Sequence, residues 1–169
     1  MNNKKRIVII GATSAIAEHC ARLWVQNQPA DITLVGRDAQ RIERVATDLQ
    51  VRSPESEIRI VQADFLDPAA ISATVKSIVD SGSVDLVLIA HGSLPEQAAC
   101  QANLNVFREA LEINGISPVL YAEAFAKHMA KINHGTIALI SSVAGGRGRK
   151  SNYVYGAAKG LLTRYAQGL

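Results

Sequence analysis

Two tyrosines and one lysine lie within the nine residues SNYVYGAAK, at positions 151–159. If this stretch is helical, residues four apart share a face, so Lys159 can reach Tyr155 but hardly Tyr153. A free phenol is a poor acid or base near neutral pH, but a nearby ammonium stabilises the phenolate form. The spacing therefore predicts Tyr155 as a proton donor to an alkoxide. An ordinary helix with packed tyrosines and a solvated lysine is the alternative.

The length and composition of the chain are typical of one ordinary globular domain, residues 1–169, with 48% hydrophobic and 20% charged residues. The net charge of +3 is mild and most basic residues are interleaved with acids, so nucleic acid binding is not indicated. The exception is GGRGRK, where Arg147, Arg149 and Lys150 share a loop near the candidate tyrosine. This loop is either simply solvated or a site for an anionic substrate or cofactor group.

The N-terminus superficially resembles a secretion signal because lysines precede an apolar run. Gly11 interrupts that run, and no later stretch approaches the roughly 20 apolar residues that cross a bilayer. We therefore expect a soluble, cytoplasmic protein.

Cys20 and Cys100 are too few for a disulfide framework, and neither they nor the four histidines have metal-ligand spacing. Reduced thiols and no metal are expected.

Short apolar runs recur between longer amphipathic segments. They are RIVII, ITLV, IRIV, VDLVLIA and TIALIS, near residues 6, 32, 58, 84 and 136. These runs predict buried parallel strands. Between them, the spacing of Ile16, Cys20, Leu23 and Trp24 predicts a helix, and Asp67 followed by Pro68 predicts a helix start. The fold class is therefore α/β, a doubly wound parallel sheet with helices on both faces and ligands at the carboxyl ends of its strands.

The segment GATSAIA, residues 11–17, lies where the first strand should turn into a helix. Amide groups and the dipole at the start of a helix attract a dinucleotide pyrophosphate. After Gly11, the other two close-approach positions are Ala15 and Ala17. Alanine still permits fairly close contact, although it tolerates positive φ less well.

Residues spread along the chain resemble, in the right order, the pattern of the short-chain dehydrogenase/reductase family. They are Gly11, Ala15, Ala17, Asp64, Asn114, Ser142, Tyr155 and Lys159. The resemblance covers essentially the whole chain. The family places its serine thirteen residues before the tyrosine, which selects Ser142 over Ser141.

The resemblance implies an NADP(H)-dependent oxidoreductase that reduces a carbonyl or oxidises a secondary alcohol by hydride transfer. Tyr155 would be the acid and base, Ser142 would hold the substrate oxygen, and Lys159 would assist the phenol and bind the nicotinamide ribose. Asn114 would support a water in the proton path. Gly115 and Pro118 predict a break in the helix around Asn114, and satisfying the backbone groups of that break is its alternative role.

The cofactor preference depends on Arg37, which follows the second strand in LVGRD. An acid there would favour NAD(H), whereas an arginine can pair with a 2′-phosphate, so NADP(H) is preferred. The alternative for Arg37 is a surface position beside the helix cap Asp38.

Asp64 would accept a hydrogen bond from the adenine amino group, or else be a solvated loop carboxylate. The expected cofactor-binding residues are Gly11, Thr13, Ser14, Ala15, Ile16, Arg37, Asp64, Phe65, Ala90, His91, Gly92, Tyr155 and Lys159.

Two features depart from the family pattern. The family usually has Asn-Ala-Gly after its fourth strand, whereas this chain has Ala90, His91 and Gly92. His91 is then either a structural residue or a substrate contact. Catalytic members run to about 250 residues, near the upper end for one domain, so we expect a C-terminally incomplete chain with its fifth strand as an exposed edge.

Other functions and partners stay open. A cofactor-binding fragment without turnover is one alternative, and a nucleotide-sugar epimerase or dehydratase is another. Within the family, the segments IAHGSLPEQAAC and SSVAGGRGRKSNYVYGAAK also resemble the decaprenylphosphoryl-2-keto-pentose reductases. The resemblance implies a homodimer or homotetramer that pairs through the two long helices containing Asn114 and Tyr155.

Overall fold

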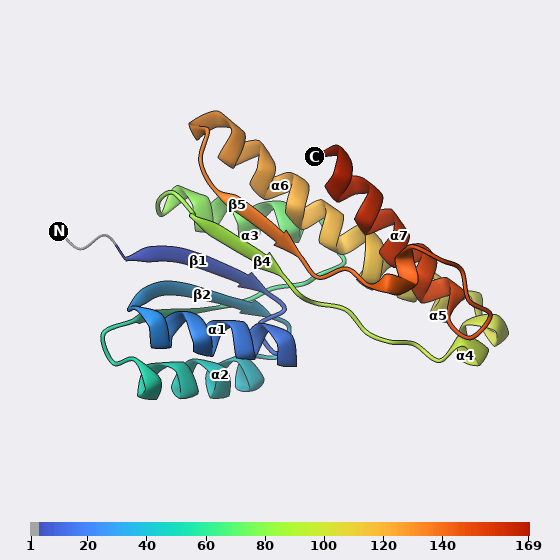
Figure 1. Ribbon diagram of the computed structural model, residues 1–169, viewed down its shortest axis with the longest axis horizontal. Coiled ribbons are helices and arrows are strands. Elements are labelled where there is room, and N and C mark those ends of the chain that lie inside the picture. Colours follow the sequence, from blue (N-terminus) through green and yellow to red (C-terminus); the bar gives the residue numbers. More distant parts are fainter. Residues whose placement is uncertain (1–3) are drawn as a thin grey trace.

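Five parallel strands form one sheet in the computed structural model, which describes residues 4–169 (Figure 1). The order across the sheet is β3-β2-β1-β4-β5. This confirms the predicted α/β class and the doubly wound topology. The strands are β1 (Lys5–Ile10), β2 (Ala30–Gly36), β3 (Glu57–Gln62), β4 (Leu86–Ile89) and β5 (Thr136–Leu139).

Helices cover both faces of the sheet (Figure 1). One face carries α1 (Ala15–Asn27) and α2 (Ala39–Arg52), and the other carries α3 (Pro68–Asp80) and α6 (Ser117–Ile132), with α7 (Tyr153–Gly168) beside α6. The shorter elements are α4 (Gln97–Ala102), α5 (Leu104–Leu111), a π-helical turn η1 (Glu112–Ile116) and a 3-10 turn η2 (Val143–Gly145). Within residues 4–169, no helix has the length and apolar character needed to span a membrane.

The central strand β1 explains why an apolar run predicts a buried strand here. Ile7 and Ile9 pack with α1 and α2, whereas Val8 and Ile10 pack with α3 and α6. Successive side chains of a strand point to opposite faces, so a strand covered on both sides must be apolar at every position.

The residues that α1 buries differ from the large apolar residues whose spacing predicts this helix. The helix is where the spacing predicts it, but its fully buried residues are Ala17, Ala21 and Val25. Ile16 and Leu23 are 52% and 60% exposed. Small side chains face the sheet because they allow the helix to approach it closely.

The start of α3 is capped as predicted. The Asp67 carboxylate accepts hydrogen bonds from the backbone N–H groups of Ala69 and Ala70, at 3.0 and 3.2 Å. Pro68 is the first helical residue, where its missing N–H costs nothing.

The predicted helix break is the π-helical turn η1, which joins α5 to α6. Such wider turns interrupt regular helices at specific points, often beside functional groups. A Cβ atom on Gly115 would lie 3.0 Å from the carbonyl oxygen of Ala158, so the glycine lets the turn pack directly on α7.

The fifth strand is an edge of the sheet, as expected. In the part of the chain that the structure describes, β5 pairs with β4 alone. The side chains of Ile137 and Leu139 are only half-buried. An edge strand of this kind leaves hydrogen-bonding groups without strand partners.

The turn η2 packs tightly on α7 through glycines. A Cβ atom on Gly145 would lie 2.7 Å from the carbonyl carbon of Lys159, and one on Gly156 would lie 2.8 Å from the Ala144 carbonyl oxygen. Because these are backbone atoms, they have little freedom to move aside.

We expect Gly145→Ala to lower the free energy of unfolding by about 1–3 kcal/mol, because the added methyl group overpacks the contact between η2 and α7. Urea denaturation measures this change. Gly148→Ala is the matched control, since a Cβ atom there meets nothing within 4 Å. Equal effects of the two substitutions would contradict the packing argument.

A buried histidine closes the carboxyl end of β4. His91 is 7% exposed, and its Nε2 lies 2.9 Å from the hydroxyl oxygen of Ser117, the first residue of α6. Its ring centroid is 4.5 Å from that of Phe65. Burial, aided by the positive charges of Lys159 and Arg37, lowers the pKa of His91 from 6.5 to about 3.

This buried histidine makes stability depend on pH. Between pH 6.5 and 3 the unfolded chain protonates residue 91 and the folded chain does not, so stability falls as the pH is lowered through that range. We expect a loss of up to about 1.4 kcal/mol per pH unit from this group. Urea denaturation between pH 7 and 5 should show a shallower pH dependence for His91→Phe than for the wild type. The exposed control His19→Gln should retain the wild-type slope, and an unchanged slope in His91→Phe would refute the assignment.

Candidate active site

Tyr155 and Lys159 lie together on the first turns of α7. The Lys159 Nζ atom is 5.8 Å from the centroid of the Tyr155 ring. The other tyrosine is directed elsewhere, since the hydroxyl of Tyr153 accepts a hydrogen bond from Gln101 Nε2 on α4 at 3.2 Å. The structure thus brings the lysine to Tyr155, the phenol that helical spacing selects.

The ammonium group of Lys159 is buried against the end of β5. The residue is 4% exposed, and Nζ donates a hydrogen bond to the Ile140 carbonyl oxygen at 3.0 Å. A Cβ atom on Gly92 would lie 3.7 Å from Nζ, so the end of β4 also approaches it. Burial lowers the pKa of Lys159. With water largely excluded, its positive charge acts on nearby groups with little screening.

Asn114 ties the loop after β4 to the π-helical turn. Its side chain is fully buried; Oδ1 accepts from the Ser93 backbone N–H at 2.8 Å, and Nδ2 donates to the Ala110 carbonyl at 2.9 Å. A Cβ atom on Gly92 would come within 2.8 Å of Oδ1. The side chain therefore satisfies backbone groups, which is the alternative role considered for it. The role of Asn114 in supporting a water in the proton path stays a prediction.

The structure distinguishes the two serines after β5. Ser142 is half-buried at the start of η2, where its hydroxyl oxygen accepts a hydrogen bond from the Ala144 N–H at 3.2 Å. A hydroxyl that accepts still has its proton to donate. Ser141 instead lies against α7, with its hydroxyl 2.6 Å from that of Thr163.

A cavity of about 280 Å³ opens at the carboxyl ends of the central strands. It lies where the strand order reverses around β1, the position at which such sheets bind nucleotides. Eight of the expected cofactor-binding residues line it, namely Gly11, Thr13, Ser14, Arg37, Phe65, Ala90, His91 and Gly92. The side chains of Ala15 and Ile16 are exposed on the first turn of α1 and are not part of the lining.

The turn into α1 suits an anionic group. Gly11 has φ of 84°, and a Cβ atom there would lie 2.5 Å from the His91 backbone nitrogen, so only glycine fits. The first amides of a helix have no intrahelical acceptors, and the Ser14 side chain makes no capping hydrogen bond to them. These groups fit a dinucleotide pyrophosphate, which helix N-termini bind readily.

Two arginines border the cavity beside Asp38, which caps α2. They are Arg37, expected from the sequence, and Arg41, which sequence reasoning missed. A signal was present, since Arg41 follows Arg37 by four residues across the start of α2. Across residues 4–169, neither guanidinium group has a carboxylate within 4.0 Å, although the Arg41 backbone N–H donates to the capping Asp38. Their charges are therefore available to an anionic ligand.

Asp64 borders a second hollow of about 410 Å³ that shares Arg37 with the cavity. Its Oδ1 accepts hydrogen bonds from the backbone N–H groups of Leu66 and Asp67, at 2.6 and 3.2 Å. These two bonds lower the pKa of Asp64. The carboxylate is thus held in place by its own loop while it remains exposed to the hollow.

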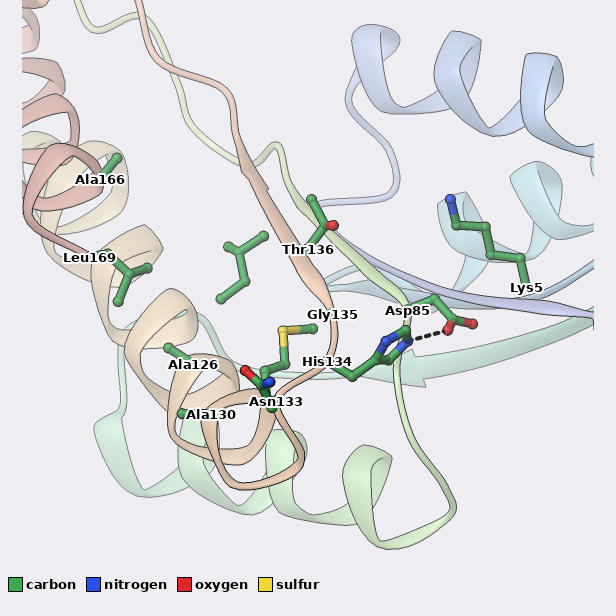
Figure 2. Close-up of a pocket in the computed structure, with 12 residues that line it drawn as sticks. Lys5, Asp85, Ala126, Ala130, Asn133, His134, Gly135, Thr136, Ala166 and Leu169 are labelled. Carbon is green, nitrogen blue, oxygen red and sulfur yellow. Dashed lines mark hydrogen bonds and ion pairs between the residues drawn. The ribbon is translucent and has the colours of Figure 1, made fainter.

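A larger hollow of about 940 Å³ lies at the opposite end of the sheet (Figure 2). It is bordered by the start of β5, by α6 and by the end of α7, and His134 Nε2 lies 2.7 Å from an Asp85 carboxylate oxygen at its rim. None of the expected site residues lines it. The expected residues instead gather at the carboxyl ends of the strands, where eight of them line the smaller cavity.

The sequence of this chain is similar to those of known proteins. The family model for the short chain dehydrogenases matches residues 5–169. An uncharacterized oxidoreductase of Streptomyces coelicolor is 31% identical over 166 residues, which are 98% of this chain and 65% of that protein.

Solved structures agree with the sequence comparison. A short-chain dehydrogenase from Sphingobium yanoikuyae, in complex with NADPH, has a TM-score of 0.86 and 25% identity over 97% of this chain and 64% of that chain. An NAD+-bound xylitol dehydrogenase has the same fold, with a TM-score of 0.88 and 22% identity over 99% of this chain and 65% of that chain. The chain spans less than two thirds of the length of each of these three proteins. From the match over residues 5–169, the chain belongs to the short-chain dehydrogenase family.

Proposed function

We propose that the protein is an NADP(H)-dependent oxidoreductase that reduces a carbonyl or oxidises a secondary alcohol by hydride transfer. The observation that carries the proposal is the buried Lys159 ammonium, 5.8 Å from the Tyr155 ring and next to Gly92 at the border of the nucleotide cavity. A phenol, an adjacent cation and a nucleotide cavity are the parts that proton-coupled hydride transfer requires.

In this proposal the side chains of the protein donate and accept the proton. The cofactor, when bound, supplies or takes up the hydride. In the direction of reduction, Tyr155 gives its proton to the substrate oxygen, and the charge of Lys159 stabilises the phenolate that remains. Ser142 donates a hydrogen bond to the same oxygen, which stabilises negative charge as it develops there. Asn114 would support a water in the proton path, and its side chain also holds the backbone of the loop after β4.

The preference for NADP(H) is supported by the charges at the end of β2. Arg37 and Arg41 both border the cavity and can pair with a 2′-phosphate, which NADP(H) carries and NAD(H) lacks. Because one relative in fold was solved with NADPH and another with NAD+, the fold is compatible with either cofactor. The choice then depends on these two side chains.

Nucleotide binding without turnover is a second candidate function for the 169-residue chain. Val143 follows Ser142 and is 90% exposed, and Leu94 in the loop after β4 is 73% exposed. Hydride transfer normally requires a site from which water is excluded, and a site this open does not exclude it.

Pairing of copies of the chain through the two long helices stays a prediction.

We expect Tyr155→Phe in the whole protein to lower kcat for ketone reduction by about a hundredfold or more, because the proton donor is lost. NADPH affinity should change little, since the ring and Lys159 remain. NADPH fluorescence titration and NADPH consumption measure the two quantities. The control Tyr153→Phe, which removes the hydroxyl near Gln101, should keep its turnover. Full activity of Tyr155→Phe would remove this residue from the mechanism.

We expect Arg37→Ala and Arg41→Ala each to narrow the preference for NADPH over NADH by about tenfold, the loss of one charge-assisted contact to phosphate. Titrating each variant with both cofactors gives the ratio of dissociation constants. Arg52→Ala is the control, because Arg52 pairs with Asp48 at the far end of α2. An unchanged ratio in either cavity variant would place that arginine outside the phosphate site.

A further inference from the structure

The helix that carries Tyr155 begins without a cap of its own. Tyr155 is the third residue of α7, and the first amides of a helix have no acceptor within that helix. In the described part of the chain, the Asn152 side chain makes no capping hydrogen bond to them. Because the end of an uncapped helix frays, the position of Tyr155 depends on contacts from outside α7.

The short helix α4, which lies beside the start of α7, provides one such contact (Figure 1). The Gln97 Oε1 atom accepts a hydrogen bond from the Val154 backbone N–H at 3.2 Å. Gln97 therefore caps α7 from another helix. Packing supports this bond, because Cys100 of α4 and Val154 are buried in the same apolar cluster, at 0% and 1% exposed. Gln97 and Cys100 are three residues apart and so share a face of α4.

Tyr155 lies between this contact and the contact of α7 with η2. Val154, the residue before it, is bonded to α4. Gly156, the residue after it, packs so closely on η2 that a Cβ atom there would lie 2.8 Å from the Ala144 carbonyl oxygen. The glycine contacts between η2 and α7 fall at Gly156 and beyond, so the order of the residues before Gly156 depends on α4.

The two ends of the Gln97 amide have different surroundings. A backbone N–H only donates, so the bond from Val154 identifies the oxygen end of the amide. The Nε2 atom at the other end is buried and has no hydrogen-bond partner among residues 4–169. Because an unpaired buried donor is unfavourable, packing alone would favour an apolar side chain of similar length, such as methionine. The acceptor oxygen is therefore what distinguishes glutamine at this position.

We propose that Gln97 is a positioning residue, which orders the first turn of α7 and so holds Tyr155 in place for proton transfer. Without this bond the Val154 N–H would be a donor without an acceptor, and the turn would open to let water reach it. Tyr155 would then lose its fixed position relative to Lys159, which lies one helical turn further along α7. The role rests on the proposed function, because that function makes Tyr155 the proton donor.

The first test follows amide hydrogen exchange in the ¹⁵N-labelled 169-residue chain, without cofactor or substrate. Its reporter is the Gly156 N–H, which bonds to the Asn152 carbonyl at 2.9 Å and is released when the first turn opens. We expect Gln97→Met to speed this exchange about tenfold, the effect of losing one helix cap. Gln97→Glu keeps an acceptor oxygen at the same reach and should retain the wild-type rate. The Leu162 N–H, further along α7, should exchange at the wild-type rate in both variants.

The second test measures NADPH binding and the reduction of cyclohexanone by the whole protein. We expect Gln97→Met to lower kcat about tenfold or more, because a small displacement of the proton donor slows its transfer. The dissociation constant of NADPH should stay unchanged, and Gln97→Glu should restore most of the lost kcat. Gln101→Met is the matched control on the same face of α4. Gln101 donates to the exposed Tyr153 hydroxyl and caps no amide, so both exchange and kcat should stay at wild-type values.

Three results would each overturn the positioning role. One is wild-type exchange of the Gly156 N–H in Gln97→Met, which would mean that the turn is ordered without the bond. Another is faster exchange with an unchanged kcat, and the third is an equal effect of Gln97→Met and Gln101→Met. Failure of the wild type to reduce cyclohexanone would count instead against the proposed function. The exchange measurement needs no turnover, so it still decides whether Gln97 orders the turn.

Discussion

The buried ammonium of Lys159 is the constraint on which the site depends. Removing a charge from water is costly unless a polar partner replaces the lost hydration, and here the Ile140 carbonyl provides a hydrogen bond. That bond requires α7 to lie close against the end of β5. The close approach depends in turn on Gly145 and Gly156, at which any side chain would meet backbone atoms. Backbone packing thus fixes a charge 5.8 Å from the Tyr155 ring, and the proposed proton transfer depends on that charge.

The sequence was sufficient to predict the positions of the strands and the placement of Lys159 near Tyr155. Parallel strands covered on both faces are continuously apolar, so their positions are visible as hydrophobic runs. Helical spacing alone relates Tyr155 to Lys159. The orientation of α1 was not accessible in this way, because it buries Ala17 and Ala21 and leaves Ile16 exposed. The face of α1 that packs on the sheet is the one with small side chains, because they allow a short distance between helix and sheet. A hydrophobicity pattern does not predict that distance.

The contacts that the sequence did not reveal at the site join segments that are distant along the chain. Asn114 was expected at the site, but its side-chain partner Ser93 lies 21 positions away, and the sequence alone does not reveal that contact. Arg41 gains its importance from the cavity that the turn into α1 helps to form. His91 occupies a position where the family has alanine, and the structure shows that its ring fills space between Phe65 and the start of α6. Spacing along the chain relates Arg41 to Arg37, but it does not identify the neighbours of Asn114 and His91.

The π-helical turn η1 has a consequence for how the chain tolerates insertions and deletions. A π-helical turn accommodates one residue more than an α-helical turn, and each residue of an α-helix rotates its successors by about 100°. Deleting any single residue from Glu112–Ile116 would let α5 and α6 join as one regular helix. The same deletion would leave the sheet-facing side chains of α6, Tyr121 and Phe125 among them, directed to the core, but it would remove the wider turn that contains the buried Asn114. The extra residue therefore shapes the backbone around Asn114 and not the orientation of α6 on the sheet.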